Sequence, residues 1–230
     1  MNDQKTANIL KYIFIVLCIT ELAAEMMALE VLVQLTKPLL MPVLLVYMRK
    51  STTGPISLSL LLAAAALIFS FVGDSVLMYA SLDEMYFLIG LGAFAVAQLF
   101  YVFSFSKAVN TNIPPLSNIL KILYSTPFLI YSVVFISLIW DGIGALKIPV
   151  SIYTALIMSM ALSAVYRQGR ADRDGVNQVI FGAILFVLSD SLIAINKFYA
   201  PMENARFFIM LTYILAQWNI VNGLVKHYNK

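Results

Sequence analysis

The stretch GAILFVLSDSLIAINK, residues 182–197, is a helix-forming apolar run with one acid, Asp190, near its centre. Ser189 precedes this acid and Ser191 follows it. An ionised carboxylate at the centre of a membrane helix costs about 2.5–3.5 kcal/mol on insertion scales, so such an acid normally faces the protein interior and marks a site. The alternative is a structural acid that bonds to a neighbouring helix. The stretch therefore predicts a membrane-spanning helix with an inward-facing acid.

The composition of the whole chain agrees with this prediction. Of its 230 residues, 61% are hydrophobic and only 12% are charged, and the mean hydropathy of +0.88 excludes a soluble globular domain. The long apolar runs lack the alternation of a transmembrane barrel. We therefore expect an all-α fold, with one integral membrane domain over residues 1–230.

Apolar runs broken by charge, Pro and Gly predict eight transmembrane helices. The expected spans are residues 8–27, 35–48, 56–79, 85–106, 119–140, 148–166, 176–198 and 207–226. Residues 12–20 are long enough for the core of a signal peptide, but Glu21, Glu25 and Glu30 follow them in place of a small-residue cleavage site. The first span is therefore expected to be retained.

The basic residues fall mainly on one side of this eight-span arrangement. The side with both chain ends holds eleven of the 15 lysines and arginines, and the other side holds Lys37, Lys147, Lys197 and Arg206. Because cytoplasmic loops are enriched in basic residues, both termini are expected to be cytoplasmic, at the inner membrane if the chain is bacterial. Arg167, Arg170 and Arg173 are assigned to a hydrated loop without a site. The net charge of +3 is spread over loops and does not indicate nucleic-acid binding.

Three polar landmarks recur in the same order in the two halves of the chain. Phe71-Val72-Gly73-Asp74-Ser75 resembles Phe186-Val187-Leu188-Ser189-Asp190-Ser191, Ala97-Gln98 resembles Ala216-Gln217, and Lys37-Pro38 resembles Lys147 with Pro149. The matches predict a parallel pseudo-repeat of four spans each, residues 8–106 and 119–226. Asp74 and Asp190 would then lie at equal depth and could face each other across one cavity.

Paired carboxylates are the candidate chemistry of such a cavity. Glu21 and Glu25, one helical turn apart, are possible accessory acids beside Asp74 and Asp190. Two acids in a poorly hydrated cavity do not ionise equally, which leaves one neutral acid and one charged base. The pair suits protonation of an ether-type bond with activation of water, proton-coupled transport, or a hydrogen-bonded clamp between the halves.

Other polar residues are candidates to bind a substrate in the same layer. Lys37 and Lys197 could bind a lipid phosphate, and their alternative role is that of interfacial anchors. The remaining candidates are Gln98, Tyr101, Ser189, Tyr213 and Gln217, whose alternative role is bonding between helices. Tyr153 is interpreted mainly as aromatic filling. A single cysteine, Cys18, and a single histidine, His227, exclude a disulfide framework and a Cys/His metal centre, so neither metal nor cofactor is expected.

Residues spread over the whole chain carry a family resemblance. They are Thr36-Lys37-Pro38-Leu39-Leu40, Gly73-Asp74, Gly92, Phe94, Tyr101, Pro149, Tyr153, Gly182-Ala183, Phe186, Ser189-Asp190, Phe198, Tyr213 and Ala216-Gln217. In these the chain resembles the lysoplasmalogenase family, the YhhN-like eight-span membrane proteins. The resemblance implies hydrolysis of the vinyl ether bond of lysoplasmalogens, to a fatty aldehyde and a glycerophospho-alcohol, by two aspartates that match Asp74 and Asp190. Many relatives carry His where this chain has Gln98, which bears on activity or substrate choice.

The resemblance and the residue chemistry together give one hypothesis. One aspartate protonates the vinyl carbon, and the other stabilises the oxocarbenium ion and activates water. A lysophospholipid is then the expected partner, with membrane lipids around the protein. A proton-coupled transporter or lipid-binding membrane protein using the same acids is the alternative, and a non-catalytic scaffold is a third. The sequence leaves open which aspartate is the acid, the headgroup, the chain length and the oligomeric state.

Overall fold

Helices account for most of the chain in a computed structural model, which describes residues 2–229, the side chain of Asn2 excepted. In order they are α1 (Asn2–Met26), α2 (Glu30–Ser51), α3 (Leu58–Leu77), α4 (Glu84–Lys107), α5 (Asn118–Ile139), the 3₁₀ helix η1 (Gly144–Leu146), α6 (Lys147–Val165), α7 (Arg173–Phe198) and α8 (Ala205–Tyr228). Residues 2–229 contain no strand. The prediction of an all-α fold is confirmed.

The predicted boundaries differ most from the structure where a helix begins with polar residues. α1 begins at Asn2 and α2 at Glu30, whereas apolarity alone places their starts at residues 8 and 35. Each helix has an acid in its first turn, Asp3 and Glu30 respectively. Acids at a helix N-terminus are stabilised by the helix dipole, so these turns are helical although they are polar.

Of the eight α-helices in residues 2–229, seven, α2 to α8, have the length and apolar composition of membrane-spanning helices. The chain is therefore a multi-pass integral membrane protein. The eighth helix, α1, is not among the seven. It nevertheless packs against α2 and α8 and exposes apolar side chains such as Tyr12 and Ile19.

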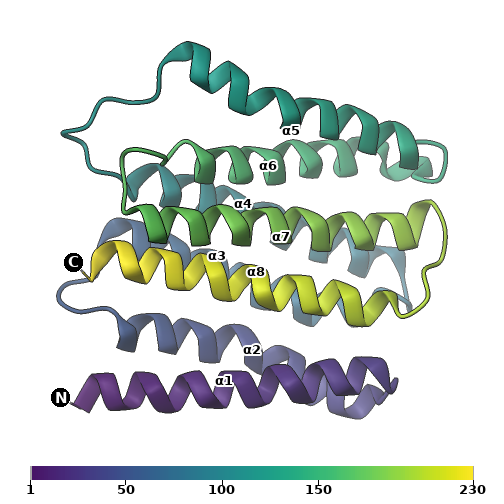
Figure 1. Ribbon diagram of the computed structural model, residues 1–230. Helices are drawn as coiled ribbons and strands as arrows, with labels where there is room; N and C mark the ends of the chain where they lie inside the picture. Colours follow the sequence, from purple (N-terminus) through teal and green to yellow (C-terminus); the bar gives the residue numbers. More distant parts are fainter. Residues whose placement is uncertain (1, 230) are drawn as a thin grey trace.

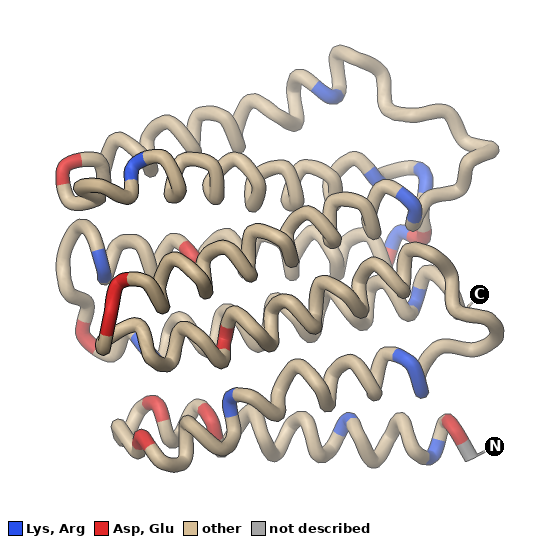
Figure 2. The backbone as a smooth tube through the Cα atoms, turned by 180° about the vertical axis from the view of Figure 1, so that it is seen from behind, with Lys and Arg blue, Asp and Glu red and all other residues tan. Residues whose placement is uncertain are grey.

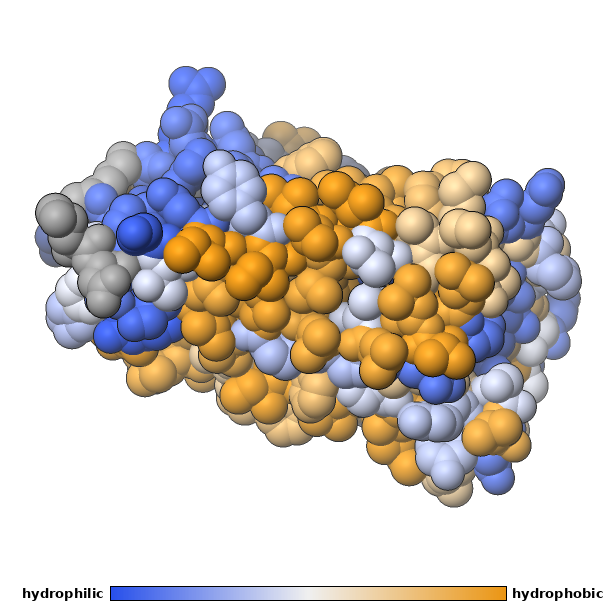
Figure 3. Space-filling view, turned by 90° about the horizontal axis from the view of Figure 1, so that it is seen from below, coloured by the Kyte–Doolittle hydropathy of each residue, from blue (hydrophilic) through white to orange (hydrophobic). Residues whose placement is uncertain are grey.

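The helices lie side by side, with α1 and α5 outermost in the view of Figure 1, and both described chain ends lie at the same end of the bundle. Charged residues gather near the two ends of the helices, although a few lie along their length (Figure 2). The face seen from below in Figure 3 has a broad apolar belt between hydrophilic ends. This distribution is the one expected of a bundle that lies across a bilayer.

Close helix pairing depends on glycines at the contacts. α3 packs most extensively with α4, and α7 with α8. At Gly182 on α7, an added Cβ would lie 2.7 Å from the Ala216 carbonyl oxygen on α8, and at Gly73 on α3 it would lie 2.6 Å from the Phe94 ring on α4. Small residues permit this approach between membrane helices. The pairing brings the acid-bearing helices α3 and α7 against α4 and α8.

A tight connection holds the first two helices together. Residues 27–29 link α1 to α2, and Ala28 adopts a left-handed conformation with φ 53°, which glycine usually takes at a helix end. The Leu29 N–H donates to the Ala24 carbonyl oxygen at 2.9 Å. The turn places Glu21 and Glu25 of α1 beside the first half of α2.

Arg167 differs from its predicted place in a hydrated loop. Its side chain is only 1% exposed, and its Nε donates to the Ala108 carbonyl oxygen at 3.0 Å. The guanidinium lies 5.9 Å from the centre of the Phe105 ring. Burial lowers the pKa of Arg167 to about 10. The assignment of Arg167 to a solvated loop was wrong because the residue joins the ends of α4 and α6, and loop composition does not reveal that contact.

Candidate active site

Asp74 on α3 lies inside the bundle and is held by residues from α8. The residue is 5% exposed, and its Oδ2 accepts a 2.7 Å hydrogen bond from the Tyr213 hydroxyl. One turn further along α8, the Gln217 amide donates to the Tyr213 hydroxyl at 3.3 Å and to the Ser70 hydroxyl at 3.1 Å. The Tyr101 hydroxyl donates to Gln217 Oε1 at 2.5 Å. Asp74 is therefore fixed by a polar chain that joins α3, α4 and α8.

Asp190 on α7 has a separate tyrosine partner. The Tyr153 hydroxyl on α6 donates a very short hydrogen bond to Asp190 Oδ2. The Gln98 amide on α4 donates to the same tyrosine hydroxyl at 3.5 Å. Gln98 is fully buried, and its Oε1 has no hydrogen-bond partner in residues 2–229. Each aspartate thus accepts from one tyrosine, and a glutamine contacts each tyrosine hydroxyl.

Aromatic rings pack next to both polar chains. Phe94, Phe186 and Tyr213 meet in edge-to-face pairs, with ring centres 5.5 to 6.2 Å apart. No hydrogen bond joins Asp74 to Asp190 in the described part of the chain. Each of the two acids therefore has its own hydrogen-bond donor.

A cavity opens next to Asp190. It has a volume of about 60 Å³, enough for a few water molecules. Its polar lining comes from Asp190, Tyr153, Thr154 and Ser191, and its other lining residues are Leu77, Phe87, Leu91, Phe94, Phe135, Val150, Ile157, Met158, Val187, Ile193, Ala194 and Phe198. Asp74 is not among the lining residues. A molecule in this cavity would meet one acid and three hydroxyl-bearing side chains in an enclosure that is mostly apolar.

A larger charged cleft, which we call the mouth, adjoins this cavity. It has a volume of about 630 Å³ and shares Leu77, Phe87 and Ile193 with the cavity. Five charged residues line the mouth: Glu25, Glu30, Lys37, Lys197 and Arg206. The three shared side chains thus separate a polar compartment from an apolar one that contains a carboxylate.

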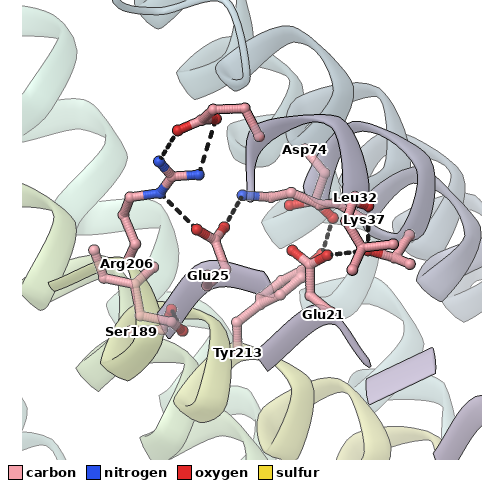
Figure 4. Close-up of polar contacts among 11 residues, drawn as sticks. Glu21, Glu25, Leu32, Lys37, Asp74, Ser189, Arg206 and Tyr213 are labelled. Atoms are coloured by element: carbon pink, nitrogen blue, oxygen red, sulfur yellow. Dashed lines mark hydrogen bonds and ion pairs between the residues drawn. The ribbon is translucent and has the colours of Figure 1, made fainter. Parts of the chain in front are cut away.

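Ion pairs organise one side of the mouth, as Figure 4 shows. Arg206 on α8 binds Glu25 through Nε at 2.5 Å and Glu30 through Nη1 at 2.5 Å. Lys37 Nζ lies 3.7 Å from the other oxygen of Glu25. Glu25 is buried and paired on both oxygens, so its charge is compensated.

Lys197 is the cation of the mouth without a carboxylate partner within 4 Å in the described residues. Its ammonium lies 4.5 Å from the centre of the Phe87 ring and 5.7 Å from that of Phe198. A cation over an aromatic face is held in place but keeps its positive charge. Lys197 is therefore available to an anionic group in the mouth, beside the wall that the two compartments share.

Glu21, one of the two predicted accessory acids, is more fully buried than Glu25. It is 0% exposed, and its Oε2 accepts a 2.5 Å hydrogen bond from the Thr36 hydroxyl on α2. Its Oε1 has no hydrogen-bond partner in residues 2–229. Figure 4 shows Glu21, Tyr213 and Asp74 in the same region of the site. Glu21 therefore belongs to the Asp74 side of the site, and Glu25 to the mouth.

The sequence-predicted residues divide into three groups in the structure. Asp190 lines the cavity, and Glu25, Lys37 and Lys197 line the mouth. Apart from Ser189, the other predicted residues are buried and line neither space: Glu21, Asp74, Gln98, Tyr101, Tyr213 and Gln217. Ser189 points toward α8, where its hydroxyl donates to the Ile209 carbonyl oxygen at 3.0 Å.

Sequence reasoning missed the roles of Tyr153 and Arg206. Tyr153 precedes its partner Asp190 by 37 positions, and Arg206 follows Glu25 by 181 positions. The available signal for the mouth was the prediction that Arg206, Lys37 and Lys197 lie on the same side of the membrane; the structure places all three at the mouth. No periodicity within one helix identifies partners that lie on different helices.

A family model matches the region of the chain that contains both aspartates. Residues 32–224 match the model of the YhhN family. The chain is 34% identical over 166 residues to "Lysoplasmalogenase TMEM86A" of Homo sapiens, covering 70% of this chain and 63% of that protein. It is 33% identical over 152 residues to "Lysoplasmalogenase TMEM86B" of Sus scrofa, covering 66% of this chain and 58% of that protein.

These matches cover less than two thirds of the length of the relatives. No solved structure matches the chain significantly. The family match contains Lys37, Asp74, Asp190 and Lys197 and begins after Glu21 and Glu25.

Proposed function

Because this chain belongs to the YhhN family, we propose that it hydrolyses the vinyl ether bond of lysoplasmalogens, releasing a fatty aldehyde and a glycerophospho-alcohol. The observation that carries the proposal is the cavity at Asp190, which adjoins the charged mouth across Leu77, Phe87 and Ile193. A single-chain phospholipid has an apolar chain, a charged head and a reactive bond between them. The two compartments match these two parts, and the carboxylate lies on the apolar side of their shared wall.

Asp190 is the proposed general acid because proton transfer to carbon needs contact, and Asp190 is the aspartate that lines the cavity. Its protonated carboxyl delivers a proton to the alkenyl carbon one bond from the ether-bearing carbon. The ether-bearing carbon becomes an oxocarbenium ion. Asp74 does not line the cavity, so its proposed role is to stabilise this positive charge as a carboxylate.

The same Asp190 carboxylate, now ionised, takes a proton from the water that attacks the oxocarbenium carbon. The product is a hemiacetal, whose hydroxyl proton passes to the ether oxygen as the carbon–oxygen bond to glycerol breaks. The fatty aldehyde and the free glycerol hydroxyl leave, and Asp190 is again protonated. All atoms of the substrate and one water are accounted for.

The remaining candidates position these groups. Tyr153 with Gln98, and Tyr213 with Gln217 and Tyr101, fix the two carboxyl groups by hydrogen bonds. Lys197 and Lys37 bind the substrate phosphate in the mouth, with Lys197 as the principal contact because it lacks a carboxylate partner. Glu21 supports the region around Asp74, and Ser189 supports the contact between α7 and α8.

The proposed topology has eight spans, both termini in the cytoplasm and a parallel four-plus-four repeat. Both described ends lie at the same end of the bundle (Figure 1). α3 pairs with α4 as α7 pairs with α8, and α4 contacts α6 as α8 contacts α2. These equivalent pairings support a twofold axis along the membrane normal. Asp74 and Asp190 lie on the equivalent helices α3 and α7.

Aldehyde release by the purified full chain in lipid nanodiscs tests the proposal. Wild-type protein should convert a 1-alkenyl lysophospholipid to aldehyde, and Asp190→Asn and Asp74→Asn should each abolish the reaction. Asp141→Asn, in an exposed loop, is the matched control and should keep full activity. Melting curves of all three variants check that they fold. Full activity in both site variants, or no aldehyde from a folded wild type together with proton-driven uptake in vesicles, would reject hydrolysis.

A further inference from the structure

Helix α5 is the least buried of the membrane-spanning helices. In its most apolar window only 6% of the residues are buried, against 33% to 56% in the other six spans. It contacts α6 and α7 and lies at the edge of the bundle (Figure 1). Phe135 and Ile139 are its buried residues, and Pro127 interrupts its backbone hydrogen bonding. α5 therefore packs only loosely against the side of the bundle.

An apolar groove runs between α5 and the two helices beneath it. Its volume is about 290 Å³, and it is lined by Pro127, Phe128 and Tyr131 of α5, Met158 of α6, and Ile184, Val187 and Leu188 of α7. Ile184 and Leu188 are 50% and 44% exposed on the outer surface. Since this surface belongs to membrane-spanning helices, the groove faces the lipid chains of the bilayer.

The groove adjoins the Asp190 cavity. Met158 and Val187 line both spaces, so the groove adjoins the cavity at these two side chains. Tyr131 marks the same junction, because its hydroxyl lies 2.7 Å from the hydroxyl of Ser191, which lines the cavity. The Tyr131 ring stacks on Phe135, which also lines the cavity.

We propose that this groove between α5 and α7 binds the hydrocarbon chain of the substrate, which enters sideways from the bilayer and passes between Met158 and Val187. The inference rests on the proposed function and adds the place and direction of the chain. The lining of the groove is apolar except for the Tyr131 hydroxyl. An apolar lining suits a methylene chain and contains no charged partner for a second charged group.

The mouth and the groove then fix the orientation of the whole lipid. The mouth adjoins the cavity at Leu77, Phe87 and Ile193, and the groove adjoins it at Met158 and Val187. A lipid with its phosphate near Lys197 and its chain in the groove must pass through the cavity. Its ether bond then lies in the cavity, beside the Asp190 carboxyl group.

Narrowing the groove at its junction tests the proposal by chain length. Val187→Phe adds a ring where the chain passes, and Val72→Phe is the matched control, since Val72 precedes Asp74 on α3 by two residues and lies outside the groove. We expect Val187→Phe to lower kcat/KM for a long-chain 1-alkenyl lysophospholipid by at least about tenfold, the effect of overfilling a packed site. A short-chain substrate that ends before the junction should be affected much less. Equal losses for both chain lengths would overturn the proposal.

A second measurement needs no turnover and separates this inference from the proposed reaction. A saturated 1-alkyl lysophospholipid with a diazirine at the end of its chain lacks the vinyl ether and is not a substrate of the proposed reaction. On irradiation it should label the segments around Pro127 to Tyr131 and Ile184 to Leu188 in wild-type protein, with less labelling in Val187→Phe. Labels concentrated on α1 or at the mouth would overturn the proposal that the chain binds in the groove, even if aldehyde is released. Specific groove labelling without aldehyde release would reject the reaction instead.

Discussion

The Tyr213 hydroxyl on α8 donates a 2.7 Å hydrogen bond to Asp74 on α3, 139 positions away in the chain. On the other side of the site, Tyr153 on α6 donates to Asp190 on α7. Buried carboxyl groups need such partners because an unpaired polar group costs free energy away from water. Interhelical tyrosines therefore give the two intramembrane aspartates defined positions.

Removing the hydroxyl of Tyr213 should destabilise the protein and impair the reaction. Tyr213→Phe leaves an Asp74 oxygen without its donor, which should lower the free energy of unfolding by about 1–3 kcal/mol. Aldehyde release should fall by about tenfold or more, because Asp74 loses its fixed orientation. Tyr199→Phe, at a 61% exposed tyrosine, is the control and should change neither quantity appreciably. Equal behaviour of the two variants in thermal melts and in the assay would contradict this role.

Adding one methyl group at Gly182 should separate α7 from α8. The new Cβ would lie 2.7 Å from the Ala216 carbonyl oxygen, and overfilling of this kind costs about 1–3 kcal/mol. Gly92→Ala is the same change on α4, where nothing lies within 4 Å of the new Cβ. It should be neutral or stabilising, because Ala favours helix over Gly by about 1 kcal/mol. Melting temperatures in one detergent compare the two, and a Gly182 variant as stable as the Gly92 variant would refute the close contact.

Neutralising Lys197 should weaken substrate binding more than chemistry. Lys197→Gln removes the unpaired cation of the mouth, so KM for a lysophospholipid should rise by about tenfold, the loss of one charge-assisted contact, with kcat little changed. Lys147→Gln is a close control, because Lys147 lies over the Trp140 ring at 4.6 Å much as Lys197 lies over Phe87. It does not line the mouth. A similar rise in KM in both variants would point to general surface charge rather than to a phosphate site.

Breaking the ion pair of Arg206 should destabilise the protein because Glu25 is buried. Arg206→Met leaves Glu25 with Lys37 at 3.7 Å as its remaining cation. We expect a loss of about 2–3 kcal/mol, less than for a fully buried pair because the Arg206 side chain is 46% exposed. Lys50→Met breaks the exposed pair with Asp3 and should have little or no effect on the same unfolding curve. Equal stability of both variants would show that the Glu25 pair contributes little.

Much of the architecture could be predicted from the sequence, because it depends on properties of residues that are close together in the chain. An apolar run long enough to cross a bilayer is a property of consecutive residues, and α2 to α8 have it. Asp74 and Asp190 stood out for a related reason, since a charge in an apolar span is costly wherever it points. The prediction that they lie on equivalent helices came from comparing two segments of one sequence. The all-α membrane class and the choice of candidate acids therefore did not require coordinates.

The tertiary structure alone decided which side chains meet. Tyr153 rather than Asp74 bonds Asp190, Arg206 pairs with Glu25, Ser189 turns toward α8, and Arg167 is buried. Such contacts depend on how far each helix is rotated about its axis and how closely it packs against its neighbours. Those quantities are set by the combined packing of several helices, including the close approach at Gly182 and Gly73. Hydropathy along one helix does not contain them, because it records the apolarity of a residue and not the neighbour that the residue faces.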